Sequence, residues 1–469
     1  MIRFAAALLL ILAGCATAQP AGTDSRTSFA SEVEVVRDGD RWSAEFRFDR
    51  ASPAWLFHRS ALARADNRPW RPRSWTVETP GVRLERHGWY DMLVAERGAV
   101  PARVRIRFTP FSGDLIADYE PALIFTDGSV AVFTEQFEAM PVASAAAAAR
   151  LPIDLNAANL PESPTRIRLR DRNGHVLHAG RRVAAATVAG SGDGTYVLFG
   201  PGEQVESPAI ATVLDPGLPE WIRREIAQTT PALLAHYAGE LGASGQARPT
   251  LMVSWAGPTR GLRSMGGSVL RGLIVMTFEG EGIITETEEV RQYARWFIAH
   301  EAAHFWLGQA VRYERAQDAW ITEGGADLLA VRAIEAADPG YSGRETLQSS
   351  VDDCAALGRN AIGSAAERNE HRAYYACGAV FGLVAEAASR RPFSRFIRGL
   401  IDANREGGIL TRQEWLAALT RASGDPALAR DIGDWLESGA PDPAARIAAL
   451  FRRTGVPFTA GEDGVPRLR

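Results

Sequence analysis

The sequence predicts a multidomain α+β protein: a β-rich N-terminal part, a mixed α/β middle part and a helical C-terminal part. Three observations predict this class. The chain has 469 residues, which is more than one hydrophobic core usually holds. From about residue 29 to 215, apolar and polar residues alternate between recurring Asp-Gly and Asn-Gly turns. After Pro216 the apolar residues follow the helical period, and from residue 285 onward the pattern is largely helical.

The composition is that of an ordinary soluble globular protein. Hydrophobic residues make up 46% and charged residues 23% of the chain. The formal net charge of −4 gives no electrostatic basis for nucleic-acid binding, so we expect no nucleic-acid partner.

The first residues, MIRFAAALLLILAGCATAQP, resemble a bacterial export signal with a lipidation site. Arg3 supplies positive charge, and the apolar stretch 4–12 is too short to remain as a membrane-spanning helix. The run LAGC then resembles the lipobox, whose cysteine is diacylated. We therefore predict a signal peptide at 1–14, lipidation of Cys15, a tether at 15–28, and a location on the outer membrane facing the periplasm. A plain secretory signal with a stray cysteine is the alternative.

Residues 29–215 are predicted to form an antiparallel β-sandwich or saddle domain. The stretch EVEVVRDGDRWSAEFRF reads as a hairpin around Asp38-Gly39-Asp40. The stretches RVRIRF, ALIFTDGSVAVF and GDGTYVLFG repeat the pattern of short strands joined by turns. This regularity favours one β-rich unit before the change of period.

Residues 216–390 are predicted to form an α/β domain, and residues 391–469 a helical region. The stretch 219–242 is helical in pattern, with a proline inside it. PTLMVSW and RGLIVMTF are predicted strands around a glycine-rich loop, and RGLIVMTF is a candidate edge strand able to pair with an extended peptide.

The motif HEAAHFW (300–306) contains two of the eight histidines of the chain. A helix beginning at Thr285, with Glu288 completing a capping box, would place His300 and His304 on one face, one turn apart. Both imidazoles can then bind one Zn²⁺, with Glu301 close enough to act on water. The alternative is a helix whose histidines face solvent or buried carbonyls; chance alone gives this motif in about one such chain in a hundred.

Two histidines leave a catalytic zinc one protein ligand short. Glu323, in AWITEGGAD, follows His304 after eighteen intervening residues and is the predicted third ligand. Asp327, one helical turn later, either orients a ligand histidine or is a solvated acid. These residues predict one Zn²⁺ per chain.

These motifs resemble the gluzincin metallopeptidases of the membrane-alanyl-aminopeptidase type over about residues 215–400. HEAAHFWLG matches the family's His-Glu-x-x-His-x-Trp-x-Gly, WITEGGA matches Trp-Leu-x-Glu-Gly-x-Ala, and YACG (375–378) matches Tyr-x-x-Gly. The resemblance implies a thermolysin-like catalytic domain that hydrolyses peptide bonds. It assigns Glu301 as the general base and Tyr375 as the oxyanion donor. Core packing is the alternative for Tyr375.

One family element is absent. Family aminopeptidases carry Gly-x-Met-Glu-Asn on the strand before the zinc helix, and its glutamate binds the substrate's free amine. Here the stretch is SMGGSVLRGLIVMTF, in which Gly266 or Gly267 stands for the glycine, but Val269 replaces the glutamate. An unpaired ammonium is costly to bury, so Glu279, Glu281 or an acid of the β domain substitutes, or the substrate has no free amine. Aminopeptidase and endopeptidase or N-blocked-peptide activity therefore both remain open.

Two broader interpretations of the chain stay open as well. The chain could be a non-catalytic binding lipoprotein, although retention of the metal ligands, Glu301 and Tyr375 argues against this. Glycyl-aminopeptidase relatives share the zinc layout but usually append a PDZ domain, whereas the end of this chain is helical in pattern. The sequence also leaves open whether Cys354 and Cys377 form a disulfide or stay as thiols.

Overall fold

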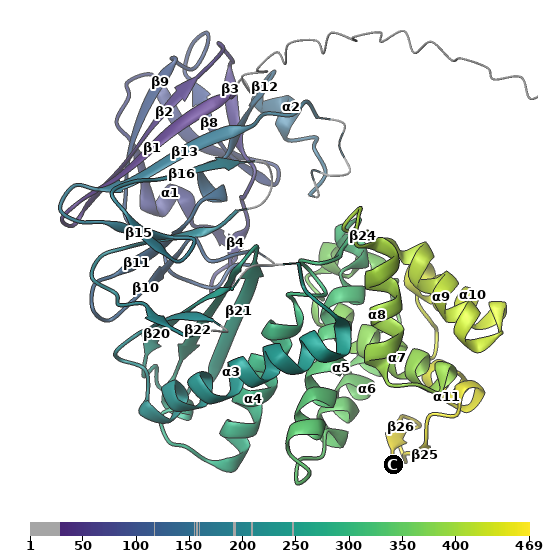
Figure 1. Cartoon of the computed structure of the whole chain (residues 1–469). Coiled ribbons are helices and arrows are strands. Elements are labelled where there is room, and N and C mark those ends of the chain that lie inside the picture. The colour runs from purple at the N-terminus through teal and green to yellow at the C-terminus, as the bar shows by residue number, and fades with distance from the viewer. Residues whose placement is uncertain are drawn as a thin grey trace, which may run out of the picture.

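The computed structural model describes residues 29–469 except 117, 154, 156–157, 159, 191–193, 208–209 and 246–247. Figure 1 shows β-sheets in the N-terminal half and a mainly helical C-terminal half. The multidomain α+β class is confirmed. The predicted signal peptide, tether and Cys15 lie outside the described residues.

The first sheet of the N-terminal part is six-stranded, in the order β16-β13-β1-β2-β9-β6. Its hairpin β1–β2 turns at Gly39, whose φ is +61°, as the sequence predicts. One pair departs from the predicted antiparallel arrangement, because β13 runs parallel to β1, to which it returns after a long connection. The strands are β1 (Ser31–Asp38), β2 (Arg41–Phe48), β6 (Trp75–Val77), β9 (Arg103–Phe108), β13 (Thr165–Asp171) and β16 (Ala186–Gly190).

Two further sheets complete this part, which we call the β domain. A four-stranded sheet has the order β12-β3-β8-β7, with β3 (Ala54–Phe57), β7 (Val82–His87), β8 (Tyr90–Ala95) and β12 (Ala139–Val142). A five-stranded sheet has the order β10-β11-β17-β14-β15, with β10 (Ala122–Ile124), β11 (Val130–Phe133), β14 (Val176–His178), β15 (Arg181–Val183) and β17 (Tyr196–Phe199). Short elements are β4 (Leu62–Ala63), β5 (Arg68–Pro69), α1 (Arg71–Ser74), η1 (Glu135–Phe137) and α2 (Ala145–Ala148).

A fully buried ion pair lies inside the β domain. The Nη1 atom of Arg71 is 2.8 Å from Asp91, and Arg86 contacts the other carboxylate oxygen at 3.0 Å. Burial outweighs the attraction of Asp91 and lowers the pKa of Arg71 to about 10. Three aromatic rings surround the guanidinium within 4.4–4.9 Å, those of Phe57, Trp70 and Trp75.

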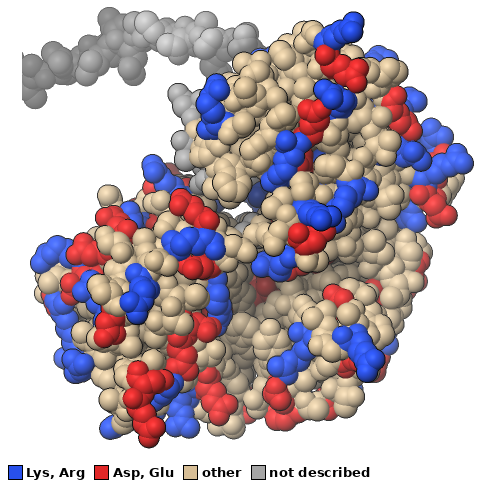
Figure 2. Space-filling model, turned by 180° about the vertical axis from the view of Figure 1, so that it is seen from behind, with Lys and Arg blue, Asp and Glu red and all other residues tan. Residues whose placement is uncertain are grey.

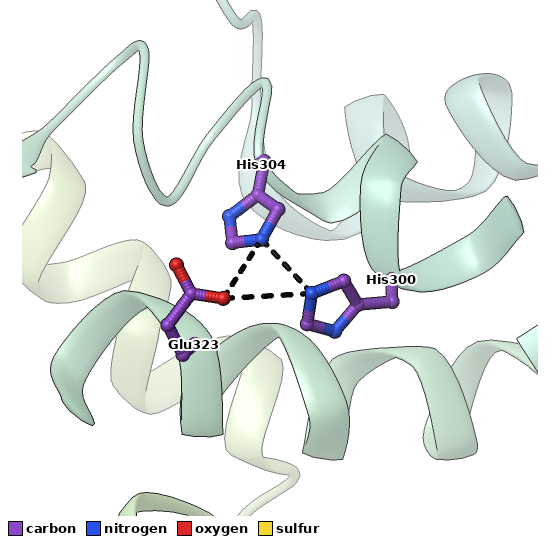
Figure 3. A group of neighbouring side chains, drawn as sticks. All are labelled: His300, His304 and Glu323. Atoms are coloured by element: carbon purple, nitrogen blue, oxygen red, sulfur yellow. Dashed lines mark hydrogen bonds and ion pairs between the residues drawn. The ribbon is translucent and has the colours of Figure 1, made fainter. Parts of the chain in front are cut away.

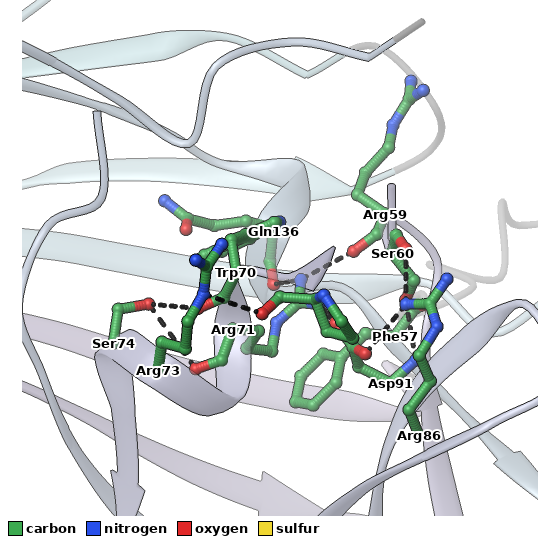
Figure 4. Close-up of polar contacts among 11 residues, drawn as sticks. Phe57, Arg59, Ser60, Trp70, Arg71, Arg73, Ser74, Arg86, Asp91 and Gln136 are labelled. Atoms are coloured by element: carbon green, nitrogen blue, oxygen red, sulfur yellow. Dashed lines mark hydrogen bonds and ion pairs between the residues drawn. The ribbon is translucent and has the colours of Figure 1, made fainter. Parts of the chain in front are cut away.

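The same guanidinium ties two loops together (Figure 4). Its Nη2 donates to the carbonyl of Arg59 at 2.6 Å and to that of Gln136 at 3.1 Å. Arg71 therefore fixes the backbone beside Arg59 and beside η1, which carries Glu135.

The second part begins with a mixed sheet in the order β18-β19-β20-β22-β21. The prediction that LIVMTF forms an edge strand is wrong. These residues belong to β22, which lies between β20 and β21, and β21 is the edge strand. The even run of apolar residues in β22 reflects burial on both faces rather than an edge position. The strands are β18 (Val205–Glu206), β19 (Ala211–Leu214), β20 (Thr250–Gly257), β21 (Ser264–Leu270) and β22 (Leu273–Glu279).

One face of this sheet packs against the β domain and the other against helices. Leu270 and Val275 share a buried cluster with Phe133 and Tyr196 of the β domain. Met276 and Phe278, on the other face, belong to the largest core, which also takes in the C-terminal helices. Because this core is continuous across residue 390, the domain boundary there remains a prediction from sequence.

The helices follow in chain order, with α5 and α7 at the centre of the second part. Of the described residues, no helix is both long and apolar enough to cross a membrane. The helices are α3 (Glu220–Leu241), η3 (Glu281–Ile283), α4 (Glu288–Ala303), η4 (Ala316–Asp318), α5 (Trp320–Ala337), α6 (Arg344–Leu357), η5 (Ile362–Arg368), α7 (Arg372–Ser389), α8 (Phe393–Asn404), α9 (Arg412–Ser423), α10 (Pro426–Ser438) and α11 (Pro443–Thr454). Short strands are β23 (Arg312–Tyr313), β24 (Ile409–Leu410), β25 (Phe458–Ala460) and β26 (Pro466–Leu468).

Two features hold α7 in place. A disulfide joins Cys354 of α6 to Cys377 of α7, which resolves the choice that the sequence left open. On its other side α7 meets α5 with glycine against glycine, because a Cβ on Gly324 would overlap backbone atoms of Gly378. Only glycine permits this approach.

We expect Asp91→Asn to destabilise the protein by about 3–5 kcal/mol, because it leaves the buried Arg71 without a counter-charge. Urea unfolding of the variant followed by circular dichroism measures the loss. The matched control is Glu78→Gln, which removes an exposed pair with Arg107 and should shift the midpoint far less. Equal midpoints for the two variants would contradict the role given to Arg71.

Candidate metal centre

Helix α4 carries the first two candidate ligands. It begins after Thr287, whose side chain accepts a hydrogen bond from the Val290 amide, so the N-cap is Thr287 and not the predicted Thr285. Each threonine is followed by acidic residues, which are favourable in the first turn of a helix, so the sequence alone does not decide which of the two is the N-cap. The face with Val290 and Phe297 packs into the core, which fixes the rotation of the helix and the direction of the histidines.

The two histidines and the predicted third ligand converge on one point (Figure 3). The Nε2 atoms of His300 and His304 are 3.0 Å apart. Glu323 Oε2, from α5, lies 3.6 Å from the first and 3.4 Å from the second. Ligands about 2.0–2.1 Å from a tetrahedral zinc ion are separated by about 3.3 Å. The donor set and its spacing therefore fit zinc.

The outer nitrogen of each imidazole is also engaged. His304 Nδ1 donates to the carbonyl of Leu307 at 2.8 Å, and His300 Nδ1 lies 2.9 Å from Asp327 Oδ1. With the protons on the Nδ1 atoms, the Nε2 lone pairs face the central point. Asp327 is only 3% exposed, so it is not a solvated acid, and its orienting role stays a prediction.

The charges at this point favour a cation. Burial alone would lower the pKa of His300, but the carboxylates of Asp327 and Glu323 raise it well above its usual value. Burial opposes ionisation of Glu323 as well, yet the two imidazoles hold its pKa far below the ordinary range. The protonated imidazoles thus stabilise the Glu323 carboxylate, and a divalent ion bound here would displace those protons and supply the positive charge in their place.

Glu301 lies beside the three candidate ligands but is not one of the residues whose donor atoms converge. It is 5% exposed, and burial raises the pKa of its carboxyl group. Gly267, on the edge strand β21, faces it directly: a Cβ built there would be 2.5 Å from Glu301 Cδ and 2.6 Å from Oε1. The glycine is needed to leave room for this carboxylate.

Tyr375, on α7, lies beside the same centre. Its ring stacks on that of His300 with centroids 5.9 Å apart and an interplanar angle of 20°. The nearby Glu323 carboxylate, together with burial, raises the pKa of Tyr375 well above its usual value. The phenol therefore stays protonated and can donate a hydrogen bond.

The remaining predicted positions lie along β21. Gly266 faces away from Glu301, and nothing lies within 4 Å of a Cβ built there. Val269 is buried, and its carbonyl accepts a hydrogen bond from Gln309 at 3.3 Å. Sequence reasoning missed Gln309, since no motif marks it; only the turn of the chain after α4 brings it to the strand.

The metal centre lies in the second part of the chain, close to the β domain. Figure 2 shows the surface hollowed between the β domain and the helical part of the molecule. Burial raises the pKa of Tyr119 of the β domain, with a smaller contribution from Tyr313, and burial together with Arg64 lowers the pKa of His371, four residues before Tyr375. The β domain therefore lies near these segments of the second part.

Comparisons with known proteins agree with this arrangement. The peptidase family M1 domain model matches residues 274–427. An aminopeptidase N family protein from Idiomarina loihiensis has a TM-score of 0.61 at 11% identity, covering 89% of this chain and 78% of that one. Leukotriene A4 hydrolase from Saccharomyces cerevisiae has a TM-score of 0.54 at 11% identity, with coverages of 88% and 68%. No curated protein sequence matches significantly.

An M1 zinc metallopeptidase from Deinococcus radiodurans has a TM-score of 0.49 at 14% identity, with coverages of 87% and 93%. At such identities the first two structures establish the fold. The helix-borne His-Glu-x-x-His, the later glutamate and the matched domain define the class: a zinc metallopeptidase, hence a hydrolase. The match to the peptidase family M1 domain covers residues 274–427 and does not extend to the β domain.

We expect Gly267→Ala to displace the Glu301 carboxylate and to lower kcat at least tenfold, because the new methyl group would occupy its position. Metal content, measured by plasma emission spectroscopy, should stay that of the wild type. Gly266→Ala is the matched control, since its methyl group meets nothing within 4 Å, and its effect should be much smaller. Equal losses in the two variants would contradict the steric argument.

Proposed function

We propose that this chain binds one Zn²⁺ through His300, His304 and Glu323 and hydrolyses peptide bonds next to a free amino terminus. The observation that carries the proposal is the convergence of three donor atoms at 3.0–3.6 Å, with Glu301 and Tyr375 close by. Zinc bound here supplies a Lewis acid that activates water and the scissile carbonyl.

The residues of the chain supply the proton transfers. Glu301, whose pKa burial raises, accepts a proton from the attacking water and returns it to the leaving amine. Tyr375 donates a hydrogen bond to the oxyanion that develops on the carbonyl. Asp327 keeps the His300 ring oriented, so that its Nε2 remains available to the metal.

The acid that binds the substrate's amine comes, in this proposal, from the β domain. Glu279, one of the acids considered from sequence, pairs with Ser264 at the far end of β21, away from Val269. Glu138 of the β domain is buried, and its burial and the nearby Glu135 raise its pKa to about 8. An ammonium group beside this acid pair would favour ionisation of Glu138, adding to the charge of Arg59, which already pairs with Glu135.

Export and lipid anchoring through Cys15 also remain part of the proposal. The disulfide between Cys354 and Cys377 supports an oxidising compartment, because such bonds rarely persist in a reducing cytosol. A mature N-terminus at Cys15 carrying acyl chains, facing the periplasm from the outer membrane, accounts for the signal-like first residues.

One observation favours a second candidate, cleavage of internal or N-blocked peptide bonds. The position of the family's amine-binding glutamate is taken by Val269, which is 8% exposed and carries no charge. An endopeptidase needs no acid at that place, so this candidate is retained as the alternative.

Glu301→Gln should abolish hydrolysis while keeping one Zn²⁺ per chain, because the residue acts on water and is not one of the converging donors. Metal analysis and a fluorogenic peptide assay measure the two properties. Glu323→Ala is the paired variant and should lose the metal. A purified protein that takes up no stoichiometric zinc would instead favour the non-catalytic binding lipoprotein.

Blocking the substrate's amine decides between the two peptidase candidates. We expect an aminoacyl reporter to be cleaved at least a hundredfold faster than its N-acetyl form, because the acid pair binds an ammonium group. Glu138→Gln should raise KM for the free-amine reporter only. Equal cleavage of the two reporters would establish the endopeptidase alternative.

A further inference from the structure

A row of aromatic rings continues from the metal ligands along α4. Tyr293 stacks on Trp296, with ring centroids 5.7 Å apart and an interplanar angle of 22°. Trp296 in turn lies 5.7 Å from the ring of His300. Spacings of three and four residues place all three rings on one face of the helix. The row therefore leads outward from the metal centre.

This face is only partly covered, because Trp296 packs against the core with one side while Tyr293 reaches the surface. Tyr293 is 37% exposed, whereas Val290 and Phe297 on the adjoining face are each 5% exposed. The indole Nε1 of the half-buried Trp296 has no hydrogen-bond partner within the described part of the chain. That nitrogen is itself enclosed, so a ligand on this face can reach the indole only through its carbon atoms, which suits an apolar side chain.

The edge strand β21 runs beside this face. Gly267 faces Glu301 near the end of α4, and Arg263, just before β21, reaches the beginning of α4. The Nη1 of Arg263 is 2.6 Å from Glu289 Oε1, and its guanidinium lies 5.7 Å from the centre of the Tyr293 ring. This ion pair joins the two elements at the end farthest from the metal.

The outer edge of β21 pairs with no other strand of the described residues, although the carbonyl of Gly267 accepts a hydrogen bond from the Ser268 hydroxyl at 2.7 Å, which a bound peptide would replace. The carbonyl of Val269 accepts its hydrogen bond from Gln309, which lies outside the sheet. Because backbone groups alternate in direction along a strand, those of Gly267 and Met265 also face outward. An extended peptide can pair there as an additional strand.

Two observations set the direction of such a peptide. An added strand pairs somewhat better antiparallel than parallel, and it would then run from Leu270 toward Ser264. The Leu270 end contacts the β domain, whose acids Glu135 and Glu138 suit a free amine. Residues after the cleaved bond would therefore pass over Trp296 and Tyr293. From Gly267 to Arg263 is about 13 Å, the length of three to four extended residues.

We infer that Tyr293 and Trp296 form a subsite for large apolar side chains among the first three residues on the C-terminal side of the cleaved bond. This inference rests on the proposed peptidase function and adds a substrate class to it: extended oligopeptides with an apolar residue after the cleavage site.

The test compares free-amine tetrapeptides that carry leucine or phenylalanine, or alanine, at the second and third positions after the cleaved bond. An aminoacyl arylamide, which has none of these residues, serves as the short substrate. In the zinc-loaded enzyme we expect kcat/KM to be at least tenfold higher for the apolar tetrapeptides than for the alanine ones. Tyr293→Ala and Trp296→Ala should reduce this ratio at least fivefold, mainly through KM.

Two variants serve as controls. Tyr293→Phe keeps the ring and should keep the preference, and Trp89→Ala removes an exposed aromatic ring of the β domain and should change nothing. If Trp296→Ala fails to fold, Tyr293→Ala alone decides, because Tyr293 is at the surface. Unchanged preference in a folded Tyr293→Ala protein would overturn the inference, as would a preference confined to the amino side of the bond.

A binding measurement separates this inference from the proposed function. Zinc-loaded Glu301→Gln should bind the apolar tetrapeptide at least tenfold more tightly than the alanine tetrapeptide in calorimetry, and Tyr293→Ala in that background should remove the difference. An enzyme that hydrolyses no reporter refutes the proposed function, and equal affinities for the two peptides refute the subsite.

Discussion

The contact between α5 and α7 is the constraint on which the rest of the metal centre depends. Gly324 and Gly378 allow the two backbones to touch, since a side chain at either position would overlap main-chain atoms of the other helix. Glu323 immediately precedes the first glycine, and Tyr375 lies one helical turn before the second. The approach of the helices therefore sets the third metal ligand beside the phenol that faces it, and α4 completes the centre because its apolar face packs into the same core.

Much of this centre could be predicted from the sequence, because its key residues lie on helices with fixed spacing. The helical repeat and the count of intervening residues are enough to place His300, His304, Glu301 and Glu323. The family resemblance adds Tyr375. The two groups that contact the outer nitrogens of the histidines differ in this respect. Asp327 lies on the same helix as Glu323, so its position could be predicted from the helical spacing. The carbonyl of Leu307 is positioned by the turn after α4, which no local sequence pattern predicts.

The errors arise where tertiary packing decides between local possibilities. LIVMTF has the pattern of a candidate edge strand, but the order of strands depends on contacts between segments far apart, and β21 occupies the edge. Thr285 and Thr287 are both acceptable N-caps by sequence, and the structure uses Thr287, whose side chain accepts a hydrogen bond from the Val290 amide. In the β domain, the parallel pairing of β1 with β13 joins segments over a hundred residues apart, which alternation alone does not reveal.

The β domain is more than a cover for the second part. Its buried Arg71 donates hydrogen bonds to the carbonyls of Arg59 and Gln136. Arg59 itself, and Glu135 next to Gln136, carry the charged side chains of a small ion-pair cluster. Arg59 pairs with Glu135 at 2.5 Å and with Asp118 at 3.3 Å. The buried Arg71, enclosed by aromatic rings, thus fixes the backbone beside Arg59 and the short helix that carries Glu135.

The disulfide of α6 and α7 has a consequence for how the protein matures. Both sulfur atoms belong to residues with no exposed surface, so neither an oxidase nor glutathione can reach them once the helices have packed. Oxidation has to take place while the chain is still open, before the helix carrying the phenol is enclosed. In the folded protein the disulfide is inaccessible to solvent and is therefore protected from reducing agents in its surroundings.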